Sequence, residues 1–232
     1  MNKIILFLLL QFFIVTAYAQ NNSVLPKDAK IEGSVVDMRS KQPQNNELIV
    51  FKSQKNGNEY QAISDSLGKF NTRLPVSDKY EIFIMGFKDS TSYNLIEIPA
   101  PRVNGFYNNA FTVNIEFEAP KTFVLDNVEF DFGKATLRPA SYKTLDELVE
   151  YLQRKSDERI EIGGHTDNIG SEVKNKALSL ERAKSIVAYL IAKGIDPARL
   201  MAKGYGSMEP IEENTTEAGR QKNRRSEVKI LE

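Results

Sequence analysis

An acidic and a basic residue are spaced so that they could face one cleft. Asp167 ends the loop Gly163–Asp167 (GGHTD), which follows a strand-like run, and Arg182 lies on the helix predicted after that loop. A carboxylate accepts hydrogen bonds from an ammonium group, and a guanidinium donates two parallel hydrogen bonds to a carboxylate. The pair therefore suits a zwitterionic ligand. The alternative is a purely structural ion pair between Asp167 and Arg182, and spacing alone leaves both interpretations open.

The helix predicted from about Glu172 to Lys193 has to position Arg182. Each helical residue advances by about 100° around the axis. Apolar residues at this period form the stripe that packs on a sheet, and here they are Leu180, Ala183, Val187 and Leu190. Asn175, Ser179 and Arg182 fall beside that stripe, so we expect them to line a groove at the edge of the core.

The C-terminal half alternates strand and helix patterns. Pro139 suits the first turn of a helix, and Leu145, Leu148, Val149 and Leu152 follow at helical spacing. Strands are expected at Asn127–Phe132, Arg159–Gly163, Leu200–Lys203 and Glu227–Leu231, with a short helical turn near Glu217–Lys222. This order predicts an α/β sandwich with two main helices on one face of a mixed sheet. Ligands of α/β sheets tend to bind at strand ends.

The N-terminal half has a strand period instead. From Lys30 to about Pro99, apolar and polar residues alternate in short segments that turn residues separate. The residues expected to face inward include Ile31, Gly33, Val35, Phe70, Thr72, Leu74, Tyr80, Ile82 and Ile84. The pattern predicts a small antiparallel β-sandwich, so the whole chain is expected to be an α+β multidomain protein.

Two features of this half stay open. Phe51, Tyr60, Phe70 and Tyr80 have strand spacing and are expected in the core, with a sugar-binding platform as the alternative. The segment Phe111–Phe117 also alternates and predicts a strand, but the pattern does not assign it to either half.

Residues 1–19 have the features of a secretory signal peptide. Lys3 precedes an apolar run from Ile4 to Val15, and Ala17 and Ala19 are small residues at the positions that a signal peptidase reads. We expect cleavage before Gln20 and an exported mature chain without a transmembrane segment. The alternative is an uncleaved membrane anchor, but the run is shorter than the roughly 20 apolar residues of a spanning helix.

Composition excludes several classes of function. The chain has 31 Lys plus Arg and 31 Asp plus Glu, so its formal net charge of zero provides no overall attraction to nucleic acid or an anionic membrane. It has no Cys and only one His, which excludes disulfides, thiol nucleophiles and a His-clustered metal site. We expect neither a metal nor a cofactor.

Five segments of the C-terminal half resemble one family. They are NVEFDFGKATLRPAS, IEIGGHTDNIGS, NKALSLERAKSIVAYLIAKGI, LMAKGYGSMEP and TEAGRQKNRRSEVKI. In this order and spacing they are similar to the OmpA-like peptidoglycan-binding domain, over roughly residues 127–232. The resemblance implies non-covalent binding of the peptidoglycan stem peptide through its diaminopimelate residue. It does not imply a membrane β-barrel.

The resemblance also implies a role for individual residues. Asp167 matches the aspartate that binds the diaminopimelate ammonium, and Arg182 matches the arginine that binds its carboxylate. The other matching positions are Asn175 and Leu178, which line the pocket, Phe130, Asp131, Phe132 and Thr166 at its edges, and Arg224 and Arg225, of which one is expected to face the peptide. The sequence departs from the family at Ser226, where an apolar β-branched residue is expected.

The N-terminal half has a resemblance of its own. Residues 33–87, with GSVVD, ISDSLGKFNTRLP and KYEIFIMGF, are similar to the carboxypeptidase regulatory-like domain, a transthyretin-like sandwich. The expected organisation is a signal peptide at 1–19, the β-sandwich at 28–100, a linker and connecting strand at 101–120, and the OmpA-like domain at 121–232.

Together these features predict a binder rather than an enzyme. We expect a periplasmic, cell-wall-associated protein, with the outer membrane as a candidate location, that anchors to peptidoglycan and contributes to envelope integrity. Its N-terminal domain is free to meet another envelope protein. One alternative is a cell-wall hydrolase that uses His165 or a carboxylate. Another is a glycan- or protein-binding module that acts through the N-terminal sandwich.

Overall fold

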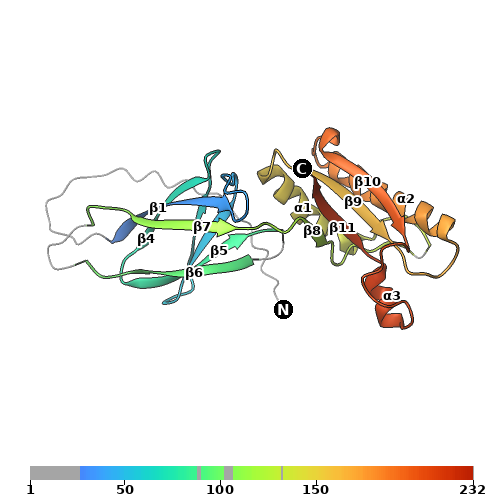
Figure 1. Cartoon of the computed structure of the whole chain (residues 1–232), viewed down its shortest axis with the longest axis horizontal. Coiled ribbons are helices and arrows are strands. Elements are labelled where there is room, and N and C mark those ends of the chain that lie inside the picture. Colours follow the sequence, from blue (N-terminus) through green and yellow to red (C-terminus); the bar gives the residue numbers. More distant parts are fainter. Residues whose placement is uncertain (1–26, 88–89, 102–106, 132, 232) are drawn as a thin grey trace.

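The structure, a computed structural model, describes residues 27–87, 90–101, 107–131 and 133–231. The predicted signal peptide, residues 1–19, lies outside the described residues. Figure 1 shows two domains end to end along the long axis of the molecule, and the buried apolar residues form one cluster in each domain. Within the described part of the chain, no helix combines the length and the apolar character needed to cross a membrane.

The N-terminal β-domain, residues 28–117, consists of two sheets. Its strands are β1 (Asp28–Asp37), β2 (Leu48–Ser53), β3 (Glu59–Ile63), β4 (Lys69–Pro75), β5 (Asp78–Met85), β6 (Ser90–Ile98) and β7 (Phe111–Phe117). One sheet has the order β4-β1-β7 and the other β3-β2-β5-β6. Because side chains alternate along a strand, residues such as Ile31, Phe70, Tyr80 and Ile82 turn inward and share one core.

The pairs formed among β1 to β6 are antiparallel, whereas β7, a strand that the sequence pattern assigned to neither half, pairs with β1 in parallel. The strand β6 ends at Ile98 opposite Asp78, and β1 begins at Asp28 opposite Pro75. Both strand ends therefore lie at the same end of the domain, so the next strand to enter the sheet runs in the direction of β1. This pairing assigns the segment Phe111–Phe117 to the N-terminal β-domain instead of a linker.

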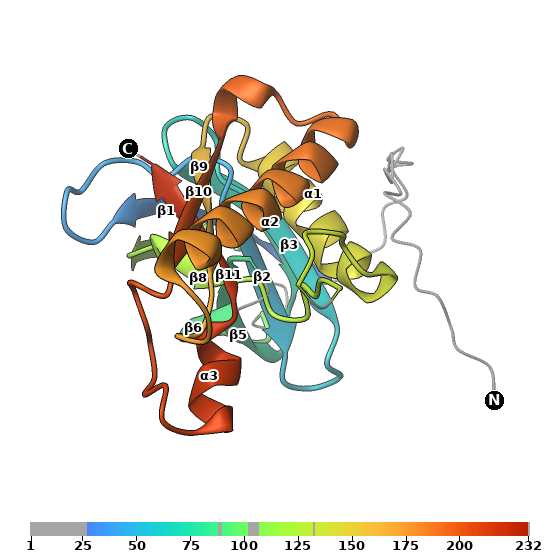
Figure 2. The same cartoon turned by 90° about the vertical axis from the view of Figure 1, so that its right-hand side faces the viewer.

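The C-terminal domain has one mixed sheet, as expected, and the order of its strands is β10-β9-β11-β8. Its strands are β8 (Thr122–Val124), β9 (Arg159–His165), β10 (Leu200–Gly206) and β11 (Ser226–Leu231). The helices are α1 (Tyr142–Arg154), α2 (Glu172–Ala192) and α3 (Glu217–Asn223), with 3-10 turns at Pro139–Ser141 and Pro197–Arg199. Figure 2 shows α1 and α2 beside each other against the sheet, where their apolar stripes bury Ile160, Ile162 and Val228.

Two glycines let α2 lie unusually close to the sheet. A Cβ atom on Gly164 of β9 would come within 2.2 Å of the Ser179 carbonyl oxygen, and one on Gly204 of β10 within 2.5 Å of the Leu180 nitrogen. As a result, the Ser179 side chain is fully buried and does not line a groove, contrary to the expectation from the helical period. Its hydroxyl accepts a hydrogen bond from the Gly206 nitrogen at 3.0 Å instead.

The predicted strand Asn127–Phe132 is wrong. The strand before α1 is β8, and Asn127 has φ of 61°, a left-handed conformation that ends extended structure. Beyond it, Phe130 forms an isolated bridge with Leu137 that closes a loop. This loop, and not a strand, approaches α2. Phe132, one of the expected site residues, lies outside the described residues.

Candidate functional site

One cleft brings together residues from the β9–α2 loop, α2 and α3. Its volume is about 590 Å³, within the range of small-ligand sites. The residues that line it are Gly133, Thr166, Asp167, Ile169, Asn175, Leu178, Arg182, Glu217, Arg220, Gln221 and Arg224. The cleft therefore lies at the carboxyl end of β9, where the sequence predicted a ligand site.

The loop that carries Asp167 is held by hydrogen bonds to its own backbone. The buried Asn175 side chain donates to the carbonyl oxygens of Asp167 and Ile169 at 3.2 and 3.0 Å. The Thr166 hydroxyl donates to the Asp167 carbonyl oxygen at 2.9 Å. One carboxylate oxygen of Asp167 accepts from the Ile169 nitrogen at 3.0 Å. These contacts fix the carboxylate at the wall of the cleft.

Arg224 is the ion-pair partner of Asp167. Its Nη1 donates to Asp167 Oδ2 at 2.6 Å, and its Nη2 donates to Glu217 Oε1 at 2.7 Å and to Gln221 Oε1. The hydrogen bond to Asp167, followed by the bond to Glu217, raises the pKa of Arg224. The sequence left open an ion pair between Asp167 and Arg182. In the structure, Asp167 instead forms its ion pair with Arg224.

Arg182 faces the same cleft from α2. Its guanidinium lies over the Phe130 ring, 5.0 Å from the centroid, and its Nε donates to the Lys134 carbonyl oxygen at 3.0 Å. Burial lowers the pKa of Arg182, and the nearby charge of Arg224 lowers it further. Among the described residues, neither Nη1 nor Nη2 donates a hydrogen bond. These two nitrogens form the terminal fork that binds a carboxylate in bidentate pairs.

Of the arginine pair, of which one was expected to face the peptide, Arg225 points away from the cleft. Its Nη2 lies 3.1 Å from Glu227 Oε2, and its Nη1 donates to the Glu209 carbonyl oxygen at 3.2 Å. Neighbouring residues near an extended segment project to opposite sides, so only Arg224 of the arginine pair can reach the cleft.

The expected edge residues separate in a similar way. Thr166, Asn175 and Leu178 line the cleft. The Phe130 ring stacks against the Arg182 guanidinium but does not line the cleft. Asp131 does not line it, and its carboxylate lies 3.5 Å from Arg138 Nε.

Sequence reasoning missed the contribution of α3. Glu217, Arg220 and Gln221 of α3 line the cleft beside the expected Arg224, which follows this helix directly. Glu217 also accepts two hydrogen bonds from Arg220 at 2.8 and 3.0 Å. Their spacing of three, four and seven residues places them on one helix face. That spacing could have indicated a shared polar face in the sequence, but it does not show which face of α3 packs against the rest of the domain.

His165 is buried behind the cleft and does not line it. Its ring stacks on Tyr205 with centroids 4.8 Å apart. Its Nε2 lies 3.2 Å from Glu227 Oε1, although neither ring nitrogen has hydrogen-bond geometry with a protein atom. His165 is therefore not positioned to contact a ligand in this cleft.

One group of side chains in the described part of the chain could approach a metal ion. The ligand atoms of His165, Glu209 and Glu227 lie within 4.8 Å of one another. Arg225 already binds the Glu227 carboxylate through Nε and Nη2, at 3.2 and 3.1 Å. This fixed positive charge opposes a cation at the same carboxylate.

These features define a class: an α/β domain with a cleft of mixed charge at the carboxyl end of a sheet strand. Residues 129–224 match the model of the OmpA family, so this part of the chain is an OmpA family domain. The matched residues include the cleft and all three helices. The predicted resemblance of the C-terminal half is confirmed. The resemblance of the N-terminal half to the carboxypeptidase regulatory-like domain stays a prediction.

Known proteins are similar to the same part of the chain. Outer membrane protein A of Bordetella avium is 44% identical over 102 residues, which cover 44% of this chain and 53% of that protein. Peptidoglycan-binding protein ArfA of Mycobacterium bovis is 41% identical over 103 residues, which cover 44% of this chain and 32% of that protein. The solved peptidoglycan-associated lipoprotein from Burkholderia pseudomallei is 26% identical, with a TM-score of 0.43, over 48% of this chain and 91% of that one. The match thus spans about half or less of the two curated relatives.

Proposed function

We propose that this protein binds peptidoglycan non-covalently through its OmpA family domain, with the diaminopimelate residue of the stem peptide in the cleft. The observation that carries the proposal is the presence of Asp167 and Arg182 in the same cleft. The side-chain end of diaminopimelate carries an ammonium and a carboxylate on one carbon. The similarity to the peptidoglycan-binding protein ArfA of Mycobacterium bovis supports the same class of ligand.

In this proposal Asp167 binds the ammonium group and the fork of Arg182 binds the carboxylate. Each hydrogen bond to a charged group contributes about 1.5 to 3 kcal/mol net, and ordering a flexible peptide offsets part of that gain. A single site is therefore expected to bind weakly. The many stem peptides of a cell wall would increase retention through repeated rebinding.

The proposal implies a location and a role. Binding to peptidoglycan would hold an exported protein in the cell envelope, where it would act as an anchor and contribute to envelope integrity. The relative named outer membrane protein A is consistent with an envelope location. The N-terminal β-domain would then be available for another envelope protein. We propose a binding function and no catalytic step.

Co-sedimentation with purified sacculi tests this function. Arg182→Ala should weaken binding by about 2 to 5 kcal/mol, because it leaves a buried ligand carboxylate unpaired. Lys184→Ala is the matched control, since Lys184 lies on the same helix and forms an exposed ion pair with Glu181 at 2.8 Å. Wild-type retention of a folded Arg182→Ala variant would contradict the assignment. Release of soluble muropeptides by the pure protein would favour the hydrolase alternative.

A further inference from the structure

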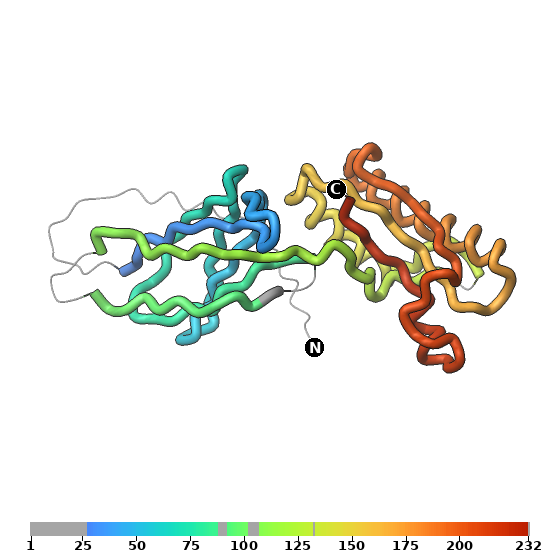
Figure 3. The backbone as a smooth tube through the Cα atoms, viewed as in Figure 1, coloured from blue at the N-terminus to red at the C-terminus, as the bar shows by residue number. Residues whose placement is uncertain are grey.

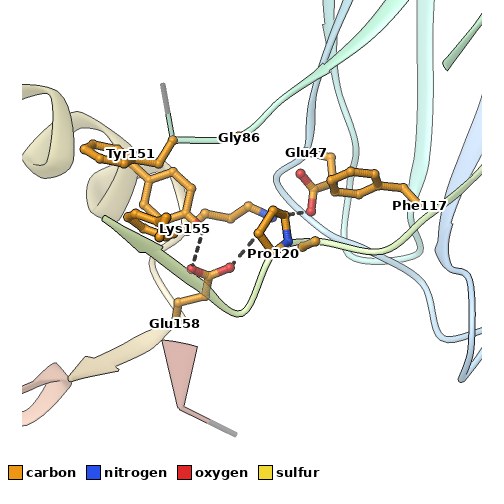
Figure 4. Close-up of a pocket in the computed structure, with 10 residues that line it drawn as sticks. Glu47, Gly86, Phe117, Pro120, Tyr151, Lys155 and Glu158 are labelled. Carbon is orange, nitrogen blue, oxygen red and sulfur yellow. Dashed lines mark hydrogen bonds and ion pairs between the residues drawn. The ribbon is translucent and has the colours of Figure 1, made fainter. Parts of the chain in front are cut away.

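The two domains meet through charged side chains at the end of α1. Arg154 Nη1 donates to the Asn46 carbonyl oxygen at 3.3 Å, and Lys155 Nζ donates to the Asn45 carbonyl oxygen at 3.1 Å. Lys155 Nζ also lies 2.5 Å from Glu47 Oε1. Figure 4 marks this ion pair with a dashed line. The loop between β1 and β2 is thereby bound to the C-terminal domain.

The Glu47–Lys155 ion pair is enclosed by the contact. The two side chains are only 4% and 6% exposed, whereas exposed ion pairs keep both groups hydrated and contribute little. Removing one partner of a buried pair is strongly destabilising, because a buried charge is left without compensation. The pair therefore selects one relative placement of the domains over alternatives in which either charge would be buried alone.

An aromatic side chain crosses the same boundary. Phe87 follows β5 of the N-terminal β-domain, yet it is buried in the core cluster of the C-terminal domain. Its ring centroid lies 4.8 Å from that of Phe123 and 6.0 Å from that of Tyr151. Aromatic packing at these distances stabilises the contact beyond the burial of area alone.

The covalent connection is held on both sides. In the N-terminal β-domain, the Phe117 carbonyl oxygen accepts from the Met38 nitrogen at 3.1 Å, and Glu118 forms an ion pair with Arg39 at 2.8 Å. In the C-terminal domain, the Lys121 carbonyl oxygen accepts from the Ile230 nitrogen at 2.8 Å. The chain passes directly from β7 into β8 (Figure 3). This leaves little chain to act as a hinge.

The space at this contact is nearly filled. Glu47, Phe87, Phe117, Pro120, Tyr151 and Lys155 enclose a cavity of only about 30 Å³, enough for a water molecule and not for a ligand. Well-packed interiors resist small displacements. Little free space is therefore left at this contact into which the side chains could shift.

The contact and the cleft lie at opposite ends of the C-terminal domain. The strand β9 starts at Arg159, shortly after Lys155, and runs away from the N-terminal β-domain toward the loop of Asp167 (Figure 1). In the N-terminal β-domain, β2 starts beside Glu47 and ends at Ser53, at the far end. The loop after Ser53 and the cleft are therefore the two ends of one elongated body.

We propose that the N-terminal β-domain is a rigid spacer, locked to the OmpA family domain by Glu47–Lys155 and Phe87, which presents the loop after Ser53 at a fixed distance and orientation from the cleft. The identity of the ligand in the cleft rests on the proposed function, whereas the rigid contact between the two domains does not. A partner at the far end would be held at a set distance from whatever the cleft binds. This gives the β-domain a function that requires no ligand pocket of its own.

Spin labels at the two ends test the proposal in the full chain. The chain has no Cys, so Lys55→Cys and Lys174→Cys introduce two unique sites at exposed positions, one in each domain. Double electron–electron resonance, without peptidoglycan, should give a single narrow distance distribution. A broad or multi-peaked distribution would overturn the proposal. Because no wall ligand is present, failure here is distinct from failure of peptidoglycan binding.

Variants at the contact test which residues form the lock. Glu47→Ala and Phe87→Ala, combined in the labelled chain, should broaden the distribution several-fold while circular dichroism shows both domains folded. Glu59→Ala is the control, since Glu59 forms a half-exposed ion pair with Lys52 at 3.4 Å in the same domain. If that variant unfolds, the paired change Glu47→Gln with Lys155→Met, which leaves no buried charge without a partner, provides the test for the ion pair. A narrow distribution in the folded lock variants would overturn the assignment of the lock to these residues.

Discussion

Arg224 forms an ion pair with the Asp167 carboxylate, which is also the group proposed to bind the ligand ammonium. In the cleft without ligand, its guanidinium lies 2.6 Å from Asp167 Oδ2, where a ligand ammonium would donate. Asp167 can accept from both groups because a carboxylate has about four lone-pair sites. Glu217 provides a second acceptor for Arg224 at 2.7 Å. An entering ammonium can therefore share Asp167 without leaving Arg224 unpaired.

The carboxylate of Asp167 should be essential for binding. Asp167→Asn is expected to lower retention on sacculi about tenfold or more, because one charge-assisted contact contributes about 1.5 to 3 kcal/mol. Asp131→Asn makes the same chemical change beside the cleft, where the carboxylate faces Arg138 instead. It should bind like the wild type. Equal losses from both variants would argue that net charge, and not the cleft, controls retention.

Glu227 should make the stability of the C-terminal domain sensitive to acid. The neighbouring His165 imidazole, together with the charge of Arg225, lowers the pKa of Glu227 from its ordinary value of 4.5. A lowered carboxyl pKa contributes stability that is present above about pH 4.5 and is lost as the pH falls toward the folded-state value. Urea unfolding of Glu227→Gln should show lower stability at neutral pH and a smaller further loss on acidification. An unchanged pH slope would contradict this assignment.

At the scale of elements, the contact between α2 and β9 sets the position of Arg182. Gly164→Ala should force α2 away from the sheet, because the new Cβ would lie 2.2 Å from the Ser179 carbonyl oxygen. Overpacking of this kind costs about 1 to 3 kcal/mol. Thermal unfolding measures the loss, and sacculus retention should fall with it. Gly163→Ala is the control on the same strand, where the nearest atoms are side-chain atoms at 3.1 Å or more.

The elements themselves differ in how far local patterns predict them. The helices α1 and α2 follow from apolar spacing, because a helix that covers a sheet needs a stripe with its own period. The segment around Asn127 does not follow, because a short apolar alternation fits a closed loop as well as a strand. The strand that pairs with β7 also cannot be predicted from the sequence pattern. Alternation shows that one face of a strand is buried, but it does not show which strand lies beside it.

At the scale of the whole molecule, the core of the C-terminal domain includes a residue of the other domain. Phe87→Ala should destabilise the C-terminal domain by about 3 to 5 kcal/mol, as expected for an aromatic side chain removed from a core. Hydrogen exchange should show the loss in α1, although the substituted residue precedes β7 in the chain. Leu95→Ala, at a position 55% exposed in β6, should have little effect. Loss of protection confined to the N-terminal strands would contradict this prediction.

The sequence by itself determined the two periods, the loop acid at Asp167, the helix base at Arg182 and the family of the C-terminal half, because each is a local pattern of residue types. Only the tertiary structure decided that Arg224 and not Arg225 reaches the cleft, that Ser179 is buried, and that Phe87 and Glu47 belong to the contact between the domains. These outcomes depend on which segments distant in the chain pack together. Local spacing does not encode that packing, which arises from the combined burial of apolar surface and pairing of charge in the folded molecule.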